Sequence, residues 1–129
     1  MLRTLIIDDN PLFLDAIAEL LGRFFGVSVV GTASNGEEGL RASAALLPDM
    51  VFVDLNMPGM DGLEVAAHLH RLLPHIQVVI VSLHDDPEYR ERAAAVGARH
   101  FICKKDLLTE LMFIISYPPA PPESVSVPQ

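Results

Sequence analysis

The chain has 129 residues, half of them hydrophobic, and its 17 acidic residues against nine Lys and Arg give a formal charge of −8. This composition predicts one acidic globular domain that does not itself bind nucleic acid, because proteins bind phosphate backbones with clustered Lys and Arg. The single cysteine excludes an internal disulfide, and no apolar run approaches the roughly 20 residues of a membrane span, so we expect a cytoplasmic protein without a membrane partner.

Five short apolar runs alternate with segments of helical spacing. The runs are residues 4–7, 27–30, 50–53, 78–81 and 101–102. Helix starts are predicted from polar caps, some followed by proline, at Asn10, at Asn35 or Ser34, and at Asp61, Asp86 and Asp106. This alternation predicts an α/β fold of the flavodoxin-like, doubly wound (βα)5 type. Its five strands would form a parallel sheet in the order 2-1-3-4-5.

The character of the sequence changes near its C-terminal end. Residues 117–123 hold four prolines, and proline favours extended conformations over helices and sheets. We therefore expect a domain over residues 1–117 and a Pro-rich segment over residues 118–129. This segment is either an unstructured tail or a truncated linker toward another domain.

Three carboxylates follow strands that are neighbours in the predicted sheet. Asp8 and Asp9 end the first apolar run, and Asp54 ends the third. In an open parallel sheet, functional residues gather at the carboxyl ends of the strands, so these side chains are expected to converge. Like charges at that distance repel unless a cation joins them, and Mg²⁺ is the cation that carboxylates and water suit best. The alternative is that Asp8 and Asp9 merely cap helices.

A hydroxyl and an ammonium are predicted at the same edge. Ser82 ends the fourth apolar run, and Lys104, one of only two lysines, follows the fifth. A carboxylate can accept a phosphoryl group when its oxygens are neutralised by a metal ion and a lysine. Taken alone, a serine in this position is more often a turn residue at a strand end, but the place of Ser82 at the same edge as the acidic residues favours a functional role.

These residues lie within longer motifs that resemble the receiver domain of two-component response regulators. The similarity runs from Leu5 to about Ser116. Its motifs are Ile7-Asp8-Asp9-Asn10-Pro11, Val53-Asp54-Leu55-Asn56-Met57-Pro58-Gly59-Met60-Asp61-Gly62, Val79-Ile80-Val81-Ser82 and Gly97-Ala98-Arg99-His100-Phe101-Ile102-Cys103-Lys104.

The resemblance implies a role for each acidic residue. Asp54 would be the phosphoacceptor and would also contact the metal ion. Asp9, supported by Asp8, would bind Mg²⁺, and the backbone carbonyl of Asn56 would be a further ligand. The phosphoryl group would come from a histidine kinase, and any dephosphorylation by the domain itself would be slow.

The resemblance also implies the parts that respond to phosphorylation. Ser82 would follow the phosphoryl group, Phe101 would be the aromatic residue that switches with it, and Lys104 would pair with a phosphoryl oxygen. Lys105 stands where the family commonly has proline. The preceding peptide bond is therefore expected to be trans, because a cis bond before a non-proline residue costs about 3 kcal/mol.

Apolar residues nearly surround the first and fifth helical segments. The first includes Leu12, Phe24 and Phe25, and the fifth includes Leu108 and Phe113. The proposed topology puts both segments on one side of the sheet, so an exposed apolar patch and a homodimer through them are expected. The alternative is that these side chains fill the core.

Three functions remain open on the sequence. The first is a phosphorylation switch, and the style of its motifs favours receivers that precede a LuxR- or NarL-type DNA-binding domain, which is absent from these residues. The second is a stand-alone receiver that acts as a protein-binding module. The third is a phosphatase with an aspartyl nucleophile, although Asn56 occupies the position where such an enzyme needs a second acid.

Overall fold

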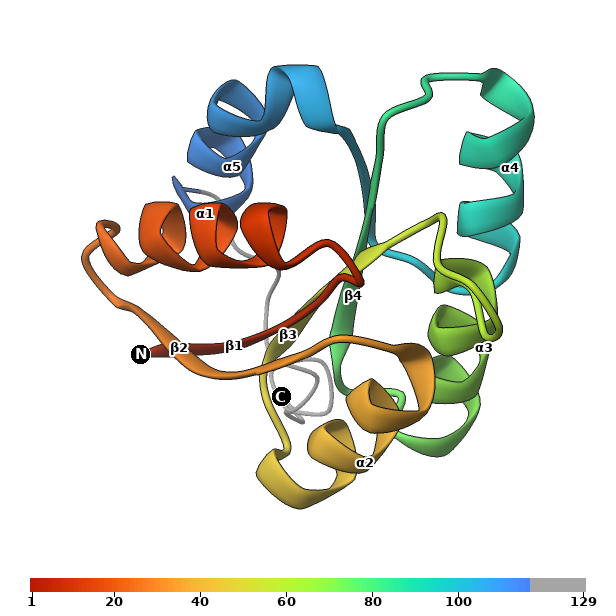
Figure 1. Ribbon diagram of the computed structural model, residues 1–129, viewed down its shortest axis with the longest axis horizontal. Helices are drawn as coiled ribbons and strands as arrows, with labels where there is room; N and C mark the ends of the chain where they lie inside the picture. The colour runs from red at the N-terminus through yellow and green to blue at the C-terminus, as the bar shows by residue number, and fades with distance from the viewer. Residues whose placement is uncertain (117–129) are drawn as a thin grey trace, which may run out of the picture.

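The computed structural model describes residues 1–116, in which strands and helices alternate along the chain (Figure 1). The strands are β1 Leu2–Ile7, β2 Val27–Ala33, β3 Met50–Asp54, β4 Gln77–Ser82 and β5 His100–Cys103. The helices are α1 Pro11–Gly22, α2 Gly36–Leu46, α3 Gly62–Leu72, α4 Pro87–Ala95 and, after a 3₁₀ turn η1 at Lys104–Asp106, α5 Leu107–Ser116. The predicted Pro-rich segment 118–129 lies outside the described residues, so the domain limit at residue 117 stays a prediction.

The strands form one five-stranded sheet in which every pairing is parallel. Its order is β2-β1-β3-β4-β5, which confirms the predicted doubly wound α/β fold. Ile7 of β1 lies opposite Val53 of β3, and Ser82 of β4 lies opposite Cys103 of β5. The carboxyl ends of four strands therefore meet at the same edge of the sheet.

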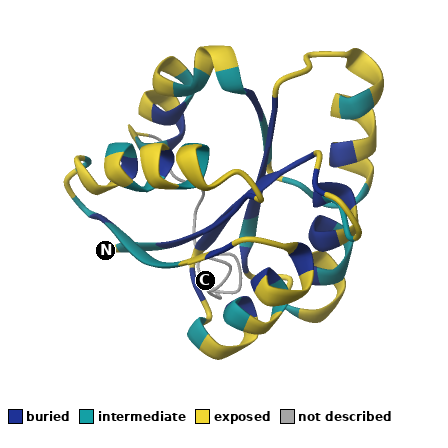
Figure 2. Ribbon diagram, in the orientation of Figure 1, coloured by how far each residue is buried: buried dark blue, intermediate teal, exposed yellow. Residues whose placement is uncertain are grey.

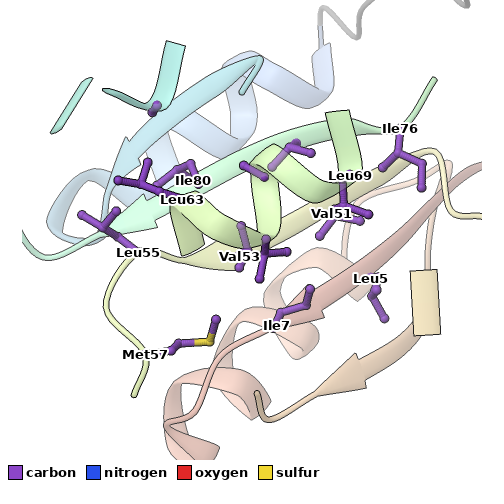
Figure 3. Packing of buried hydrophobic residues seen from close by; sticks show 14 of the residues in the cluster. Leu5, Ile7, Val51, Val53, Leu55, Met57, Leu63, Leu69, Ile76 and Ile80 are labelled. Atoms are coloured by element: carbon purple, nitrogen blue, oxygen red, sulfur yellow. The ribbon is translucent and has the colours of Figure 1, made fainter. Parts of the chain in front are cut away.

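Each face of the sheet carries its own hydrophobic core. Alternate strand residues such as Ile7, Val53 and Ile80 point to the face covered by α2, α3 and α4 (Figure 3). Their neighbours Ile6 and Phe52 pack on the other face against α1 and α5. This alternation follows from the two-residue period of a strand, and the resulting layers are visible in Figure 2 as buried strands between half-exposed helices.

Polar side chains start three of the helices. Asn10 accepts hydrogen bonds from the backbone N–H groups of Leu12 and Phe13, and Asn35, rather than Ser34, caps α2. Asp61 forms a capping box with Glu64 at the start of α3. Such caps satisfy N–H groups that have no partner inside the helix. Asp86 also precedes its helix, but its side chain makes no capping bond.

The first helix is shorter than the sequence indicates. It ends at Gly22, so Phe24 and Phe25 lie in the connection to β2. Phe24 packs against the core, whereas Phe25 is fully exposed. The apolar surface of α1 is therefore smaller than predicted, because the apolar pattern of the sequence continues beyond the end of the helix. No helix within residues 1–116 is long and apolar enough to cross a bilayer.

Two glycines shape the loop between Asp54 and α3 for different reasons. Gly59 has a φ of 75°, a left-handed conformation that strains residues with a Cβ atom. Gly62 does not have a positive φ, but a Cβ atom there would collide with the backbone carbonyl oxygen of Asp54. Its N–H also donates to the carbonyl of Leu55 at 3.0 Å. Gly62 is thus required for space, because the start of α3 rests directly on the backbone that carries Asp54.

Candidate functional site

Three carboxylates lie together at the carboxyl edge of the sheet. Asp8 and Asp9 follow β1, Asp54 ends β3, and one oxygen of each lies within 4.8 Å of the other two. Asp8 is 2% exposed and Asp54 is 7% exposed, whereas Asp9 is exposed to solvent. The convergence is the one that the strand order predicts, and Asp9 forms its open side.

Lys104 supplies positive charge to this cluster. Its Nζ atom lies 3.3 Å from Oδ2 of Asp8 and 3.2 Å from Oδ1 of Asp54. The side chain of Lys104 is only 11% exposed, whereas the neighbouring Lys105 is exposed. Of the two lysines, Lys104 is therefore the one that contacts the acids. The bond between them is trans, since residues 1–116 contain no cis peptide bond.

An aromatic ring from α1 also holds the ammonium in place. The Nζ atom of Lys104 lies 4.0 Å from the centre of the Phe13 ring, a geometry in which the ring face attracts a cation. Phe13 is not among the residues that the sequence motifs predict for the site. Its position four residues after Asp9, in the first turn of α1, is the signal that would have placed it beside the carboxylates.

The backbone after β1 fixes the orientation of Asp8. The Asn10 N–H donates to Oδ1 of Asp8 at 2.8 Å, leaving Oδ2 for Lys104. Asn10 in turn caps α1, so the same residue that starts the helix also holds the carboxylate. A buried acid with both oxygens in polar contact is well suited to a fixed binding site.

The charge of the cluster is not balanced by its own residues. Three carboxylates face one ammonium, and burial, followed by repulsion from Asp8, raises the pKa of Asp54 from 3.8 to about 6. Lys104 opposes this rise by its charge and hydrogen bond, and Asp9 adds a smaller repulsion. The site can therefore gain from a further cation.

The other predicted site residues lie around this cluster. Ser82 is fully buried at the end of β4, and its Oγ accepts a hydrogen bond of 3.0 Å from the His84 N–H. Phe101 is half-buried in β5 and packs on the core below α4. Asn56 is exposed in the loop two residues after Asp54.

Comparison with known proteins identifies the family. The family model described as the response regulator receiver domain matches residues 4–116. The chain belongs to the response regulator receiver family. This receiver is 37% identical over 112 residues to the response regulator GacA of Pseudomonas viridiflava, covering 87% of the chain and 52% of GacA.

A second curated relative is the NarL transcriptional regulatory protein of Mycobacterium tuberculosis. It is 36% identical over 110 residues, with 85% of this chain and 51% of NarL covered. The solved NarL signal receiver domain from that organism has a TM-score of 0.79 at 31% identity, covering 90% of this chain and 97% of that one. The receiver thus spans about half the length of the curated relatives that it matches.

The raised pKa of Asp54 gives a stability prediction for the metal-free protein. The folded state holds the Asp54 proton more tightly than the unfolded state, so wild type loses stability as pH rises from about 4 through about 6. Asp54→Asn has no ionisable group at this position, so this fall in stability with rising pH should be absent from the variant. In EDTA, urea denaturation should find the variant more stable at pH 7.5 by about 2 kcal/mol, with the difference shrinking toward zero at pH 4.

Asp15→Asn is the matched control, because Asp15 is an exposed carboxylate on α1. The free energy of unfolding of Asp15→Asn should differ little from that of wild type at both pH 7.5 and pH 4. An Asp54→Asn variant that is less stable than wild type at pH 7.5, or a difference that does not change with pH, would contradict the electrostatic account.

Proposed function

We propose that this receiver accepts a phosphoryl group on Asp54 from the phosphohistidine of a histidine kinase, in a Mg²⁺-dependent reaction. The observation that carries the proposal is the double contact of Lys104, whose ammonium lies 3.3 Å from Asp8 and 3.2 Å from Asp54 inside a cluster of three carboxylates. This arrangement combines a nucleophile with the positive charge that phosphoryl transfer needs.

In the proposed step, an oxygen of the Asp54 carboxylate forms a bond to phosphorus while the P–N bond of the phosphohistidine breaks. The bonding electrons leave on the histidine nitrogen, which takes up a proton. Lys104 would then pair with an oxygen of the transferred group in addition to Asp8. Because this transition state spreads charge over three oxygens, fixed positive charge is the main contribution that the site can make.

The residues present fit a magnesium ion. Asp9, with Asp8 and Asp54, offers hard oxygen ligands within a 4.8 Å cluster, and Asp9 is open to solvent, which suits an ion that keeps several waters. The Asn56 carbonyl is the proposed further ligand. Mg²⁺ bound there would supply the positive charge that balances the carboxylates and the phosphoryl oxygens.

Phosphorylation is proposed to act through Ser82 and Phe101. Ser82 is buried at the end of β4, beside the strand that carries Asp54, and its hydroxyl can donate to a phosphoryl oxygen. Phe101 lies opposite Ile80, two residues before Ser82, so a change at the end of β4 reaches β5 directly. The aromatic ring would then bias one face of the receiver between two arrangements.

The output of the switch is proposed to be transcriptional control through a DNA-binding domain. The support is the similarity to the GacA response regulator and to NarL, which is named a transcriptional regulatory protein. The domain itself would be a phosphoacceptor with at most slow autodephosphorylation. A stand-alone receiver that works through protein contacts is the alternative.

Incubation with acetyl phosphate and Mg²⁺ should add one phosphoryl group, detected by intact mass spectrometry and located at Asp54 by peptide mapping. Asp54→Asn should add none, because the nucleophile is lost. Lys104→Met should slow the reaction by about a hundredfold, as expected when a charged donor is removed from a phosphoryl site.

Asp15→Asn, on the exposed face of α1, should be phosphorylated like wild type. If wild type gains no phosphoryl group, the proposal is wrong, and a receiver that acts only as a protein-binding module becomes the better interpretation. The same addition on wild type and Asp54→Asn would show that a different residue accepts the group.

A homodimer through α1 and α5 is proposed as the form in which the switch acts. Both helices cover the same face of the sheet (Figure 1). Exposed apolar side chains remain on both helices. Leu108 is 53% exposed and Met112 54% exposed on α5, and Leu12 is 80% exposed on α1. Burial of such side chains against a second copy would stabilise the pair.

Light scattering with and without beryllium trifluoride, a phosphoryl mimic, should detect this dimer, and Met112→Glu should weaken it by about tenfold or more. Leu72→Glu is the matched control, because Leu72, at 62% exposed, is at least as accessible as Met112 but lies on α3, across the sheet. A strict monomer at high concentration under both conditions would contradict the proposed dimer.

A further inference from the structure

Arg90 of α4 contacts two other parts of the receiver at once. Its Nε atom forms an ion pair of 2.6 Å with Oδ1 of Asp85, in the loop that connects β4 to α4. Its Nη1 atom donates to the backbone carbonyl of Phe101 at 3.4 Å. The guanidinium carbon also lies 4.8 Å from the centre of the Phe101 ring. Arg90 therefore joins the β4–α4 loop to the aromatic residue of β5.

The same loop is tied to the end of β4. The His84 N–H donates to Oγ of Ser82, and the Cys103 Sγ lies 3.9 Å from the carbonyl oxygen of Leu83. Residues 82–85 are thus held by Ser82 at one end and by Arg90, through Asp85, at the other. A displacement of Ser82 toward a phosphoryl group would change the His84 contact, one residue away from the Asp85 ion pair.

We propose that Arg90 is a positioning residue that holds Phe101 and the β4–α4 loop in the arrangement described here, and that it thereby opposes the response to phosphorylation. This inference rests on the proposed function, because it assumes that Ser82 and Phe101 respond to a group on Asp54. Contacts made only in one arrangement stabilise that arrangement, and a ligand that favours the other one must overcome them.

The expected effect is moderate because the contacts are partly exposed. Side chains of Arg90 and Asp85 are 43% and 44% exposed. Ion pairs and cation–π contacts in such settings change an equilibrium by a few-fold each. Loss of the whole set should therefore favour the phosphorylated arrangement by about fivefold.

The test compares variants of the 129-residue chain by amide NMR during titration with beryllium trifluoride at saturating Mg²⁺. Arg90→Met keeps an unbranched side chain but removes the charge. The dissociation constant of this variant for beryllium trifluoride should be about fivefold lower than that of wild type. In the absence of ligand, the amide signals of residues 83–86 should already lie part of the way toward their bound positions. A substitution that only weakened packing would not move the signals in that direction.

Three further variants sharpen the result. Arg90→Lys keeps the positive charge, so its dissociation constant for beryllium trifluoride should lie between those of wild type and Arg90→Met. Asp85→Asn removes only the ion pair, so it should lower the dissociation constant by less than Arg90→Met does. Arg92→Met, at an exposed arginine of the same helix, should behave like wild type.

The outcomes separate the two proposals. Wild type that binds the mimic, with Arg90→Met binding equally or more weakly, overturns the role of Arg90 and leaves the proposed function standing. Wild type that neither binds beryllium trifluoride nor becomes phosphorylated refutes the proposed function, and the inference about Arg90 fails with it.

Discussion

The central constraint on the structure is the mutual repulsion of three carboxylates, Asp8, Asp9 and Asp54. One oxygen of each lies within 4.8 Å of the other two, and two of the three residues are buried. The ammonium of Lys104 lies against two of them and relieves part of the repulsion. Burial of the Asp54 carboxylate, together with the repulsion from Asp8 that Lys104 does not cancel, raises the pKa of Asp54 to about 6. A site in this condition is stabilised by a divalent cation and can then tolerate a further anionic group. The fold supplies the rigid frame that keeps the carboxylates from moving apart.

That frame consists of short, local contacts. The parallel register brings the ends of β1 and β3 side by side, and the Asn10 N–H orients Asp8 while Asn10 starts α1. Gly62 allows the start of α3 to lie directly on the backbone of Asp54. On the opposite side of the site, Ser82 and the loop that follows it are held by single hydrogen bonds and by the exposed ion pair of Arg90. The acidic side is therefore held by buried contacts, whereas the contacts of the β4–α4 loop are fewer and more exposed.

The fold and the acidic cluster could be predicted because both depend on patterns that are visible in the amino-acid sequence itself. Alternating apolar runs and helix caps gave the topology, and strand ends placed Asp8 and Asp54 in one cluster. The end of α1 was predicted too late, since Phe24 and Phe25 continue the apolar pattern into the connection that follows. The contact of Arg90 with Phe101 could not be predicted, because it depends on the side-chain conformation of Arg90 on α4 relative to the ring of Phe101 on β5. The steric need for glycine at position 62 also could not be predicted, because it depends on how closely the start of α3 approaches the backbone of Asp54.

The most direct test of the account is a crystal structure of the full chain grown with Mn²⁺, whose anomalous signal locates the ion. We expect one ion at the carboxyl edge of the sheet, bound to Asp9, Asp54 and the Asn56 carbonyl at about 2.0–2.2 Å. Lys104 should remain on Asp8 in that structure. An ion bound elsewhere, or an empty carboxylate cluster at a Mn²⁺ concentration that supports phosphorylation, would contradict the claim that unbalanced acidic charge at Asp54 is what the site is built to use.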